Sequence, residues 1–333
     1  MKKIYGSFLL LSLVLFLSCG TPNDPESIIG GDGGYKIVGK LATSGYSQDV
    51  VVKDTIAYLT QGEGGLTIIS VSNHSSPKLI SNVIQGIKGY SKKIAVKDSV
   101  VFISAGAFGI SVVDVVDPGN PNVTITNAQP KPAQGFDILN NFLITAIGEY
   151  GFQISDISYP FEPDPRGVTS TPGFAQSVFV SPDTNYLLAA CGEMGFGLFN
   201  ISELQTGWGS YPMTDWIDTP GYAEDVVSHP TLPYAFIACG TAGLYVIDYS
   251  DSANVKIIGS YPTGGYAKEI AFQDNILYVT TELRGLQIFS VSDLSSPVRI
   301  GTVQTEYAVG LYVDDSYVYV ADEKEGLVVI SIP

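Results

Sequence analysis

The sequence offers little material for metal, thiol or nucleic-acid chemistry. Its 333 residues include two histidines, three cysteines and 17 basic residues against 33 acidic ones, for a formal net charge of −16. This charge argues against nucleic acid as a partner, because phosphate binding needs basic patches. The chain contains no phosphate-binding loop, dinucleotide fingerprint, EF-hand loop or serine-nucleophile elbow. We therefore expect no nucleic-acid partner, no metal and no other cofactor.

Long apolar runs are missing after residue 20, so no later segment reaches the roughly 20 residues that a transmembrane helix needs. A short apolar run, Phe8 to Leu17, follows two lysines and precedes Ser18-Cys19, and these are the parts of an export signal. The placement of Cys19 resembles the lipobox of bacterial lipoproteins, in which the cysteine carries the lipid. The resemblance implies a signal peptide over 1–18, lipidation of Cys19 and an anchor in the cell envelope, with the outer membrane favoured. An ordinary secretory signal, with Cys19 incidental, is the alternative.

The sequence is rich in glycine, with 36 residues, and in a repeated strand pattern. A glycine followed by alternating apolar residues recurs about every 43 residues. The seven occurrences begin at Gly65, Gly109, Gly151, Gly197, Gly243, Gly285 and Gly326. Each unit adds further segments of period-2 alternation bounded by turn residues, as at 267–273, 276–281 and 298–303. This period suits one four-stranded blade of a β-propeller.

The two ends of the repeat array complement each other. The last unit stops after its third strand at Pro333, whereas residues 35–43 resemble a fourth strand with no unit before it. Pairing the two would close the ring and remove two open sheet edges. We therefore predict an all-β fold over 35–333, a monomeric seven-bladed β-propeller with four-stranded antiparallel blades, the last closed by the N-terminal strand. The polar residues 19–34 are expected to be a flexible tether.

The repeated units resemble LVIVD repeats, named for a Leu-Val-Ile-Val-Asp strand. The most similar stretches are GLYVIDY at 243–249, GISVVDV at 109–115 and GFQISDI at 151–157. The resemblance implies a β-propeller in an exported or surface protein of bacteria or archaea, and it implies no particular activity. Units four and five depart most, because Glu193 to Gly197 adds two residues and 202–220 replaces the usual turn with a longer insert.

Candidate ligand-binding residues lie in two sets of loops that a propeller places on one face. The loops that lead into the innermost strands carry aromatic residues, namely Tyr46, Tyr90, Phe136, Phe174, Tyr222, Tyr266 and Tyr307. The loops between second and third strands carry carboxylates, namely Glu63, Glu149, Glu193, Glu282, Glu323 and Glu325, with Arg284 and Lys324 as their bases. Aromatic rings beside carboxylates suit sugars or cations, since rings stack on apolar sugar faces and carboxylates accept hydroxyl hydrogen bonds.

Charges that do not repeat are better candidates than residues present in every unit, because a repeated residue often serves blade packing. The candidates are Tyr266, Tyr307, Glu282, Arg284, Glu323, Lys324 and Glu325, which come from neighbouring units. A packing role for the aromatic residues and a solvated cluster for the charges are the alternatives.

A second candidate surface contains both tryptophans, Trp208 and Trp216, within the insert 202–220. These side chains could contact a partner protein or could cover the end of a sheet. The insert joins a third to a fourth strand, so we expect it on the face opposite the aromatic loops.

The histidines and later cysteines show no catalytic arrangement. His74 and His229 lie in or beside turns of different units, without metal-ligand spacing, and are expected to be exposed. Cys191 and Cys239 occupy equivalent places near the end of a second strand, where a small structural residue is expected. Such positions in adjacent blades are usually too far apart for a disulfide.

The leading hypothesis is a non-enzymatic, lipid-anchored binding module for a protein or glycan at the cell envelope. The alternative is a propeller-type hydrolase or lyase acting on a glycan or lactone, with Glu282, Glu323 or Glu325 as acid or base. A purely structural envelope component is a third possibility.

Overall fold

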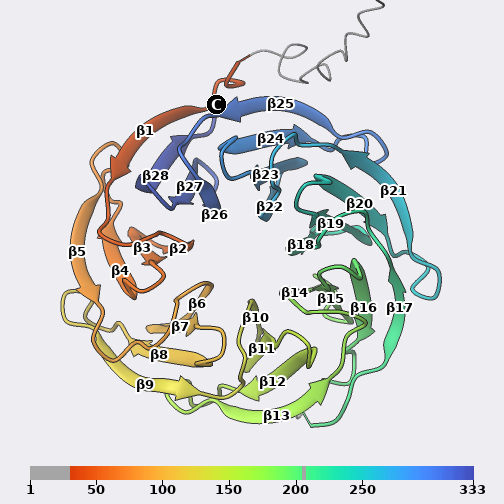
Figure 1. Cartoon of the computed structure of the whole chain (residues 1–333), viewed down its shortest axis with the longest axis horizontal. Coiled ribbons are helices and arrows are strands. Elements are labelled where there is room, and N and C mark those ends of the chain that lie inside the picture. Colours follow the sequence, from red (N-terminus) through yellow and green to blue (C-terminus); the bar gives the residue numbers. More distant parts are fainter. Residues whose placement is uncertain (1–30, 205–207) are drawn as a thin grey trace, which may run out of the picture.

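The computed structural model describes residues 31–204 and 208–333, and its regular elements are 28 strands in seven four-stranded sheets arranged as a ring (Figure 1). The export signal at 1–18, Cys19 and most of the expected tether lie outside the described residues. Within the described part of the chain, no helix is long and apolar enough to span a bilayer.

The blades are numbered along the chain, with strands given from the centre of the ring outward. Blade one contains β2 (Asp49–Lys53), β3 (Ile56–Thr60), β4 (Leu66–Ser70) and β5 (Lys78–Val83). Blade two contains β6 (Ile94–Lys97), β7 (Val100–Ser104), β8 (Ile110–Asp114) and β9 (Asn122–Ala128). Blade three contains β10 (Phe136–Leu139), β11 (Phe142–Ala146), β12 (Phe152–Asp156) and β13 (Asp164–Thr169). Blade four contains β14 (Ser177–Val180), β15 (Tyr186–Ala190), β16 (Phe196–Asn200) and β17 (Met213–Ile217). Blade five contains β18 (Asp225–Ser228), β19 (Tyr234–Ala238), β20 (Leu244–Asp248) and β21 (Lys256–Tyr261). Blade six contains β22 (Glu269–Gln273), β23 (Ile276–Thr280), β24 (Leu286–Ser290) and β25 (Val298–Val303). Blade seven contains β26 (Ala308–Val313), β27 (Tyr317–Asp322), β28 (Gly326–Ser331) and, outermost, β1 (Lys36–Leu41).

The ring closes as the sequence predicted. β1 pairs antiparallel with β28, from Lys36 opposite Ser331 to Leu41 opposite Leu327. Both ends of the chain therefore contribute to one sheet, and Figure 1 shows the C-terminus beside β1. Joining the ends in this way leaves no blade incomplete. The predicted fold class is confirmed.

The hydrophobic core lies between neighbouring blades. Phe152 of blade three packs edge-on against Phe199 of blade four, with ring centroids 5.1 Å apart, and both side chains are fully buried. Burying a side chain of this size contributes roughly 1.5–3 kcal/mol. Because each blade buries both of its faces in this way, its three inner strands are apolar almost throughout, as in β7 and β27.

A short turn after the second strand fixes the loop aromatics. In blade one, Gly62 has a φ of +54° and exchanges backbone hydrogen bonds with Ser91 of blade two. A Cβ on Gly62 would lie 2.6 Å from the ring of Tyr90, so only glycine lets this ring pack on the turn. The second-to-third-strand turns and the aromatic loops therefore share one face, as predicted, and we call it the loop face.

The pattern of hydrogen bonds corrects two sequence assignments. Phe136 lies in β10, and Pro132-Ala133 takes the place of the loop aromatic, because Ala133 bonds to Gly106 as Ser91 bonds to Gly62. Glu193 to Gly197 contains no added residues.

In blade four the turn glycine is Gly195, with a φ of +76° and its carbonyl 2.7 Å from the Cys191 amide. Gly197 lies inside β16. The expected insert is also shorter than 202–220, because residues 213–217 form β17, the ordinary fourth strand of blade four.

Residues 31–35, at the end of the expected tether and the start of the predicted first strand, lie against blade six. The Thr302 amide donates to the Gly31 carbonyl at 3.3 Å, and the ring of Tyr35 is buried edge-on to Tyr278. The first described residues are thereby held on the outer part of the ring near β25 (Figure 1).

Candidate functional site

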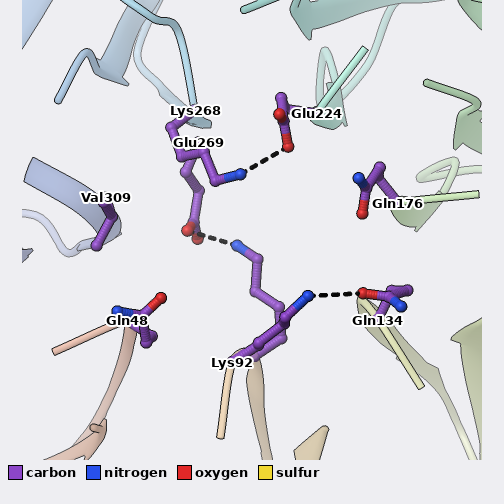
Figure 2. Close-up of a pocket in the computed structure, with 9 residues that line it drawn as sticks. Gln48, Lys92, Gln134, Gln176, Glu224, Lys268, Glu269 and Val309 are labelled. Carbon is purple, nitrogen blue, oxygen red and sulfur yellow. Dashed lines mark hydrogen bonds and ion pairs between the residues drawn. The ribbon is translucent and has the colours of Figure 1, made fainter. Parts of the chain in front are cut away.

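The centre of the loop face opens into a polar cavity of about 140 Å³, at the mouth of the channel that the innermost strands surround (Figure 2). One residue of every blade lines this mouth. It directly follows the small residue, such as Ser91 or Ala133, that bonds to the turn of the preceding blade, or the equivalent small residue Ser47 in blade one. The seven residues are Gln48, Lys92, Gln134, Gln176, Glu224, Lys268 and Val309. Lys93 and Glu269, the next residues along blades two and six, also line it. We call this set the channel mouth.

Hydrogen bonds and ion pairs organise the channel mouth. The Lys268 ammonium lies 2.7 Å from a carboxylate oxygen of Glu224, and the Tyr266 hydroxyl donates to the other oxygen. Lys92 donates to the Gln134 side-chain oxygen at 3.2 Å. The ion pair fixes the blade-five and blade-six side chains, whereas Lys92 is bound to a neutral amide (Figure 2).

Amide side chains at the mouth are linked to the surrounding loops. The Gln176 amide donates to the Tyr222 hydroxyl at 3.1 Å, and the Gln48 amide donates to a Glu323 carboxylate oxygen at 2.9 Å. The Gln176 nitrogen has a second N–H for the cavity, whereas the Gln48 nitrogen also donates to the Tyr46 and Ser47 carbonyls at 3.2 and 3.3 Å. The mouth therefore presents donors as well as charges to the cavity.

An ion-pair cluster forms the floor of the mouth. Lys93 contacts Glu269 from across the channel and lies 4.0 Å from Asp49. Burial alone would lower the pKa of Lys93, but the charges of Asp49 and Glu269 raise it above its ordinary range. Burial and the charge of Asp49 raise the pKa of Glu269, with Lys93 opposing. A second cavity, deeper in the channel, is also lined by Lys93 and Glu269, so their pair lies at the junction of the two.

Two of the predicted site residues reach the channel mouth. Tyr266 binds Glu224, and Lys268 lies over its ring at 5.9 Å from the centroid. Glu323 accepts from Gln48. Both contacts connect predicted loop-face residues with lining residues that directly precede an innermost strand.

The other predicted residues form the rim beyond the mouth. Burial and a hydrogen bond to Glu282 raise the pKa of Tyr307 to about 12, and Lys324 lies over the Tyr307 ring at 5.7 Å. Glu325 forms an ion pair with Lys40 of the outermost strand β1, which directs it away from the channel. Arg284 lies along Gly265, where an added Cβ would approach its Cγ to 2.9 Å. The structure therefore divides the predicted cluster into an inner and an outer part.

Sequence reasoning missed most of the channel mouth, although a signal was present. In six units, the lining residue follows a loop aromatic by two positions, as in Tyr46-Ser-Gln48 and Tyr222-Ala-Glu224. The small residue between them repeats, whereas the polar residue changes from blade to blade. A variable polar residue between two repeated positions is the pattern that could have marked the site.

Exposed aromatic rings surround part of the mouth. Tyr46 is 62% exposed, and Tyr90 is 38% exposed, in the loops that lead to Gln48 and Lys92. Phe108 and Tyr150, in the turns after β7 and β11, are also exposed on the loop face. Blades one to three therefore present apolar ring surface beside a polar cavity.

The predicted partner surface is divided by the structure. Trp208 is exposed in the loop between β16 and β17, with the Arg166 guanidinium 5.0 Å from its ring centroid. Trp216 lies in the outermost strand β17 rather than in an insert. Antiparallel order places the Trp208 loop on the face opposite the loop face, as predicted.

The prediction of an exposed turn histidine is wrong for His229, which is buried. Its Nδ1 accepts backbone hydrogen bonds from Thr231 and Leu232, and burial lowers its pKa. His74 is half-buried and stacks on Tyr317 with ring centroids 3.8 Å apart. The two imidazoles therefore stabilise loops on separate blades.

The two cysteines that the structure describes are free and buried, in keeping with a structural role. Burial raises the pKa of Cys191 and of Cys239 to about 12. Thiols of such high pKa are poor nucleophiles at neutral pH. Over residues 31–204 and 208–333, no group of three or more His, Cys, Asp or Glu side chains is arranged to hold a metal ion.

The fold and its central mouth define the protein as a seven-bladed β-propeller. A family model for the LVIVD repeat matches residues 44–84, 220–263, 264–305 and 307–332, which form most of blades one, five, six and seven. The chain therefore contains LVIVD repeats in these four blades.

Two further comparisons give no activity for this chain. A search of the curated proteins finds no match to this chain. Among solved structures, the chain is similar to the computationally designed Ika8 protein, with a TM-score of 0.63 and 10% identity over 89% of this chain and 100% of that one. At this identity the likeness shows the fold alone.

Proposed function

We propose that this propeller is a lipid-anchored binding module of the bacterial cell envelope, and that it binds a glycan on its loop face. The observation that carries the proposal is the channel mouth, where seven equivalent positions hold three glutamines, two lysines, one glutamate and one valine. A packing role would favour the same residue in each blade, as at the small residue before it. Unlike residues facing a cavity suit an asymmetric ligand.

The exposed rings beside the mouth support a sugar as that ligand. Tyr46 and Tyr90 can stack on the apolar face of a pyranose, while the amides and charges of the mouth can bind its hydroxyl groups. The Trp208 surface on the opposite face would be the next candidate if the partner were a protein.

A hydrolase or lyase is the second candidate, because Glu282 and Glu323 both lie near Tyr307. Glu325 is a weaker candidate acid or base than the sequence implied, because Lys40 holds it at the outer edge. Turnover of a bound glycan, lost in a Glu282→Gln/Glu323→Gln variant, would favour this alternative.

The experiment is glycan-array binding by the protein and by a Tyr46→Ala/Tyr90→Ala variant. We expect saturable binding by the parent and at least a tenfold loss in the variant, since stacking on both rings is removed. Tyr159→Ala is the matched control, because Tyr159 is 63% exposed, much like Tyr46, but lies in the third-to-fourth-strand loop on the other face. Absence of glycan binding by the folded protein would contradict the proposal.

The anchor is tested separately. We expect the parent to be recovered with membranes and a Cys19→Ala variant to remain soluble or unprocessed, as measured by fractionation and labelling with a fatty-acid analogue. Equal membrane recovery of both would contradict lipidation at Cys19.

A further inference from the structure

Basic residues are concentrated at the channel mouth of an otherwise acidic protein. Three lysines, Lys92, Lys93 and Lys268, and two glutamates, Glu224 and Glu269, line the cavity. Glu224 is already paired with Lys268, and Glu269 with Lys93. In the described part of the chain, the ammonium of Lys92 contacts the neutral oxygen of Gln134 and no carboxylate. The mouth therefore holds one ammonium group that lacks a counterion.

The surroundings of Lys92 disfavour its charge. Burial and the charge of Lys268 lower the pKa of Lys92, and the charge of Glu224 opposes this only in part. An anion in the cavity would relieve the repulsion between Lys92 and Lys268. Both lysines line the cavity, so an anion bound there would be placed where it stabilises the charge of Lys92.

Neutral donors beside Lys92 complete a set that suits a carboxylate. Gln48, Gln134 and Gln176 line the same cavity. The amide nitrogen of Gln176 uses one N–H on Tyr222, whereas that of Gln48 is occupied by Glu323 and by the Tyr46 and Ser47 carbonyls, so Gln48 offers its oxygen to a ligand. An ammonium and several amide N–H groups are the usual partners of two carboxylate oxygens. Hydroxyl groups of the same ligand can donate to the amide oxygens.

The shape of the channel sets the direction from which a ligand enters. The cavity of about 140 Å³ exceeds the roughly 30 Å³ share of one water several-fold, and the Lys93–Glu269 pair lies at its floor. A charged group would therefore enter from the loop face and stop above that pair. Tyr46 and Tyr90 precede two of the lining residues and remain exposed for the ring that bears the charge.

We propose that the channel mouth binds the carboxylate of an acidic sugar, with Lys92 as its counterion and the amide nitrogens of Gln134 and Gln176 as hydrogen-bond donors. This inference rests on the proposed glycan-binding function and names the sugar class that the site takes. The acidic group enters end-on, while the apolar face of the sugar lies against the exposed tyrosines.

The test compares galacturonic acid with galactose, which differ at one carbon, by titration calorimetry on the full-length protein in detergent. We expect galacturonic acid to bind at least tenfold more tightly at low salt, with the preference weakened at high salt. Lys92→Gln should abolish the preference for galacturonic acid over galactose. Acetate is included to separate recognition of a sugar acid from binding of any carboxylate.

Lys88→Gln is the matched control, because Lys88 is exposed in the same loop, four residues before Lys92, and does not line the cavity. It should keep the full preference. Equal affinity for the two sugars, or an undiminished preference in Lys92→Gln, would overturn the acidic-sugar assignment while leaving glycan binding intact. Acetate binding as tightly as galacturonic acid would overturn it as well. Failure of every glycan on the array, acidic or neutral, would instead overturn the proposed function itself.

Discussion

The two halves of the loop face use the same aromatic position in different ways. In blades six and seven, Tyr266 and Tyr307 are tied to the carboxylates of Glu224 and Glu282, and each ring has a lysine ammonium within 6 Å of its centroid. In blades one and two, Tyr46 and Tyr90 expose their rings. The fold is the same in all four blades, so the difference arises from neighbouring side chains.

The residue two positions after the aromatic creates much of this difference. Glu224 of blade five reaches Tyr266 of blade six, whereas the corresponding residues of blades one and two are Gln48 and Lys92. The repeat determines the position of each side chain in the fold, and the residues that differ between units determine the interactions made there. The comparison thereby separates a half whose rings are held in polar contacts from a half whose rings remain available to a ligand.

The largest expected effect on stability comes from removing the ion pair that connects the two halves of the loop face across the channel. Lys93 of blade two pairs with Glu269 of blade six across the channel. Lys93→Met should lower the free energy of unfolding by about 3 kcal/mol at pH 7, because it leaves Asp49 and Glu269 without a nearby cation. The loss should shrink toward pH 5, where these carboxyl groups, whose pKa values burial raises, can take up a proton. Urea denaturation at the two pH values measures it.

Lys53→Met is the control for that loss. Lys53 lies at the far end of β2 and donates to the exposed carbonyl of Asp98. Its replacement should cost less than about 1 kcal/mol at either pH. Equal losses in the two variants would mean that the cluster on the channel axis does not link the halves.

The ring and its closure could be predicted from the sequence because both depend on period-2 patterns repeated seven times. Each blade buries two faces, so its strands are rich in apolar residues. An apolar run in a single unit would identify a strand only ambiguously, whereas the same run in seven units identifies it clearly. The unpaired strands at the two ends then allowed only one closed arrangement. Fold-level inference thus rested on many independent observations of one pattern.

Register within a unit was harder to predict, as Phe136 and Gly197 show. A slip of one residue turns every side chain to the wrong face, but a slip of two restores the faces and leaves the alternation unchanged. Gly195 and Gly197 are two apart, and only the backbone conformation, with φ of +76° at Gly195, distinguishes them. The channel mouth was missed for a related reason, since its residues differ from blade to blade and no single motif marks them.

The next prediction concerns a buried carboxyl group of blade three and the pH dependence of stability. Asp137 of blade three accepts backbone hydrogen bonds from Ile138 and from Val180 of blade four, both at 2.7 Å, much as Asp225 bonds to the amide of Ile270 in blade six. Burial raises the pKa of Asp137 to about 6, with both hydrogen bonds opposing the rise. Burial of the Asp137 side chain should therefore become less favourable where the carboxyl group loses its proton.

The sign of the pH effect follows from proton binding. Between pH 4 and pH 6 the unfolded chain has lost the Asp137 proton while the folded chain keeps it, so stability falls as pH rises and levels off above pH 6. The contribution is about 2 kcal/mol. Asp137→Asn should remove this fall, as measured by denaturation at pH 4 and pH 7. Asp156→Asn is the sign control, because hydrogen bonds from Ser158 lower the pKa of Asp156 and its contribution should instead increase with pH.

The smallest expected effect concerns the free energy of unfolding lost where a turn glycine of the repeat is replaced by another residue. Glu282 has a φ of +50° at the turn position where blades one to five have glycine, as at Gly240 with +51°. Glu282→Gly should raise the free energy of unfolding by about 0.5–1 kcal/mol, since a side chain in the left-handed region is strained. It should also bring the pKa of Tyr307 down from about 12, because the carboxylate beside the phenol is removed.

Glu323 occupies the same turn position in blade seven without a positive φ, so Glu323→Gly should lower stability by about 0.5–1 kcal/mol. Thermal unfolding of the two variants, with ultraviolet titration of the tyrosines, separates the outcomes. Opposite signs would show that Glu282 is kept at a cost in stability, as expected of a residue with a binding or catalytic role, whereas losses in both variants would place it among the residues that simply hold the turn.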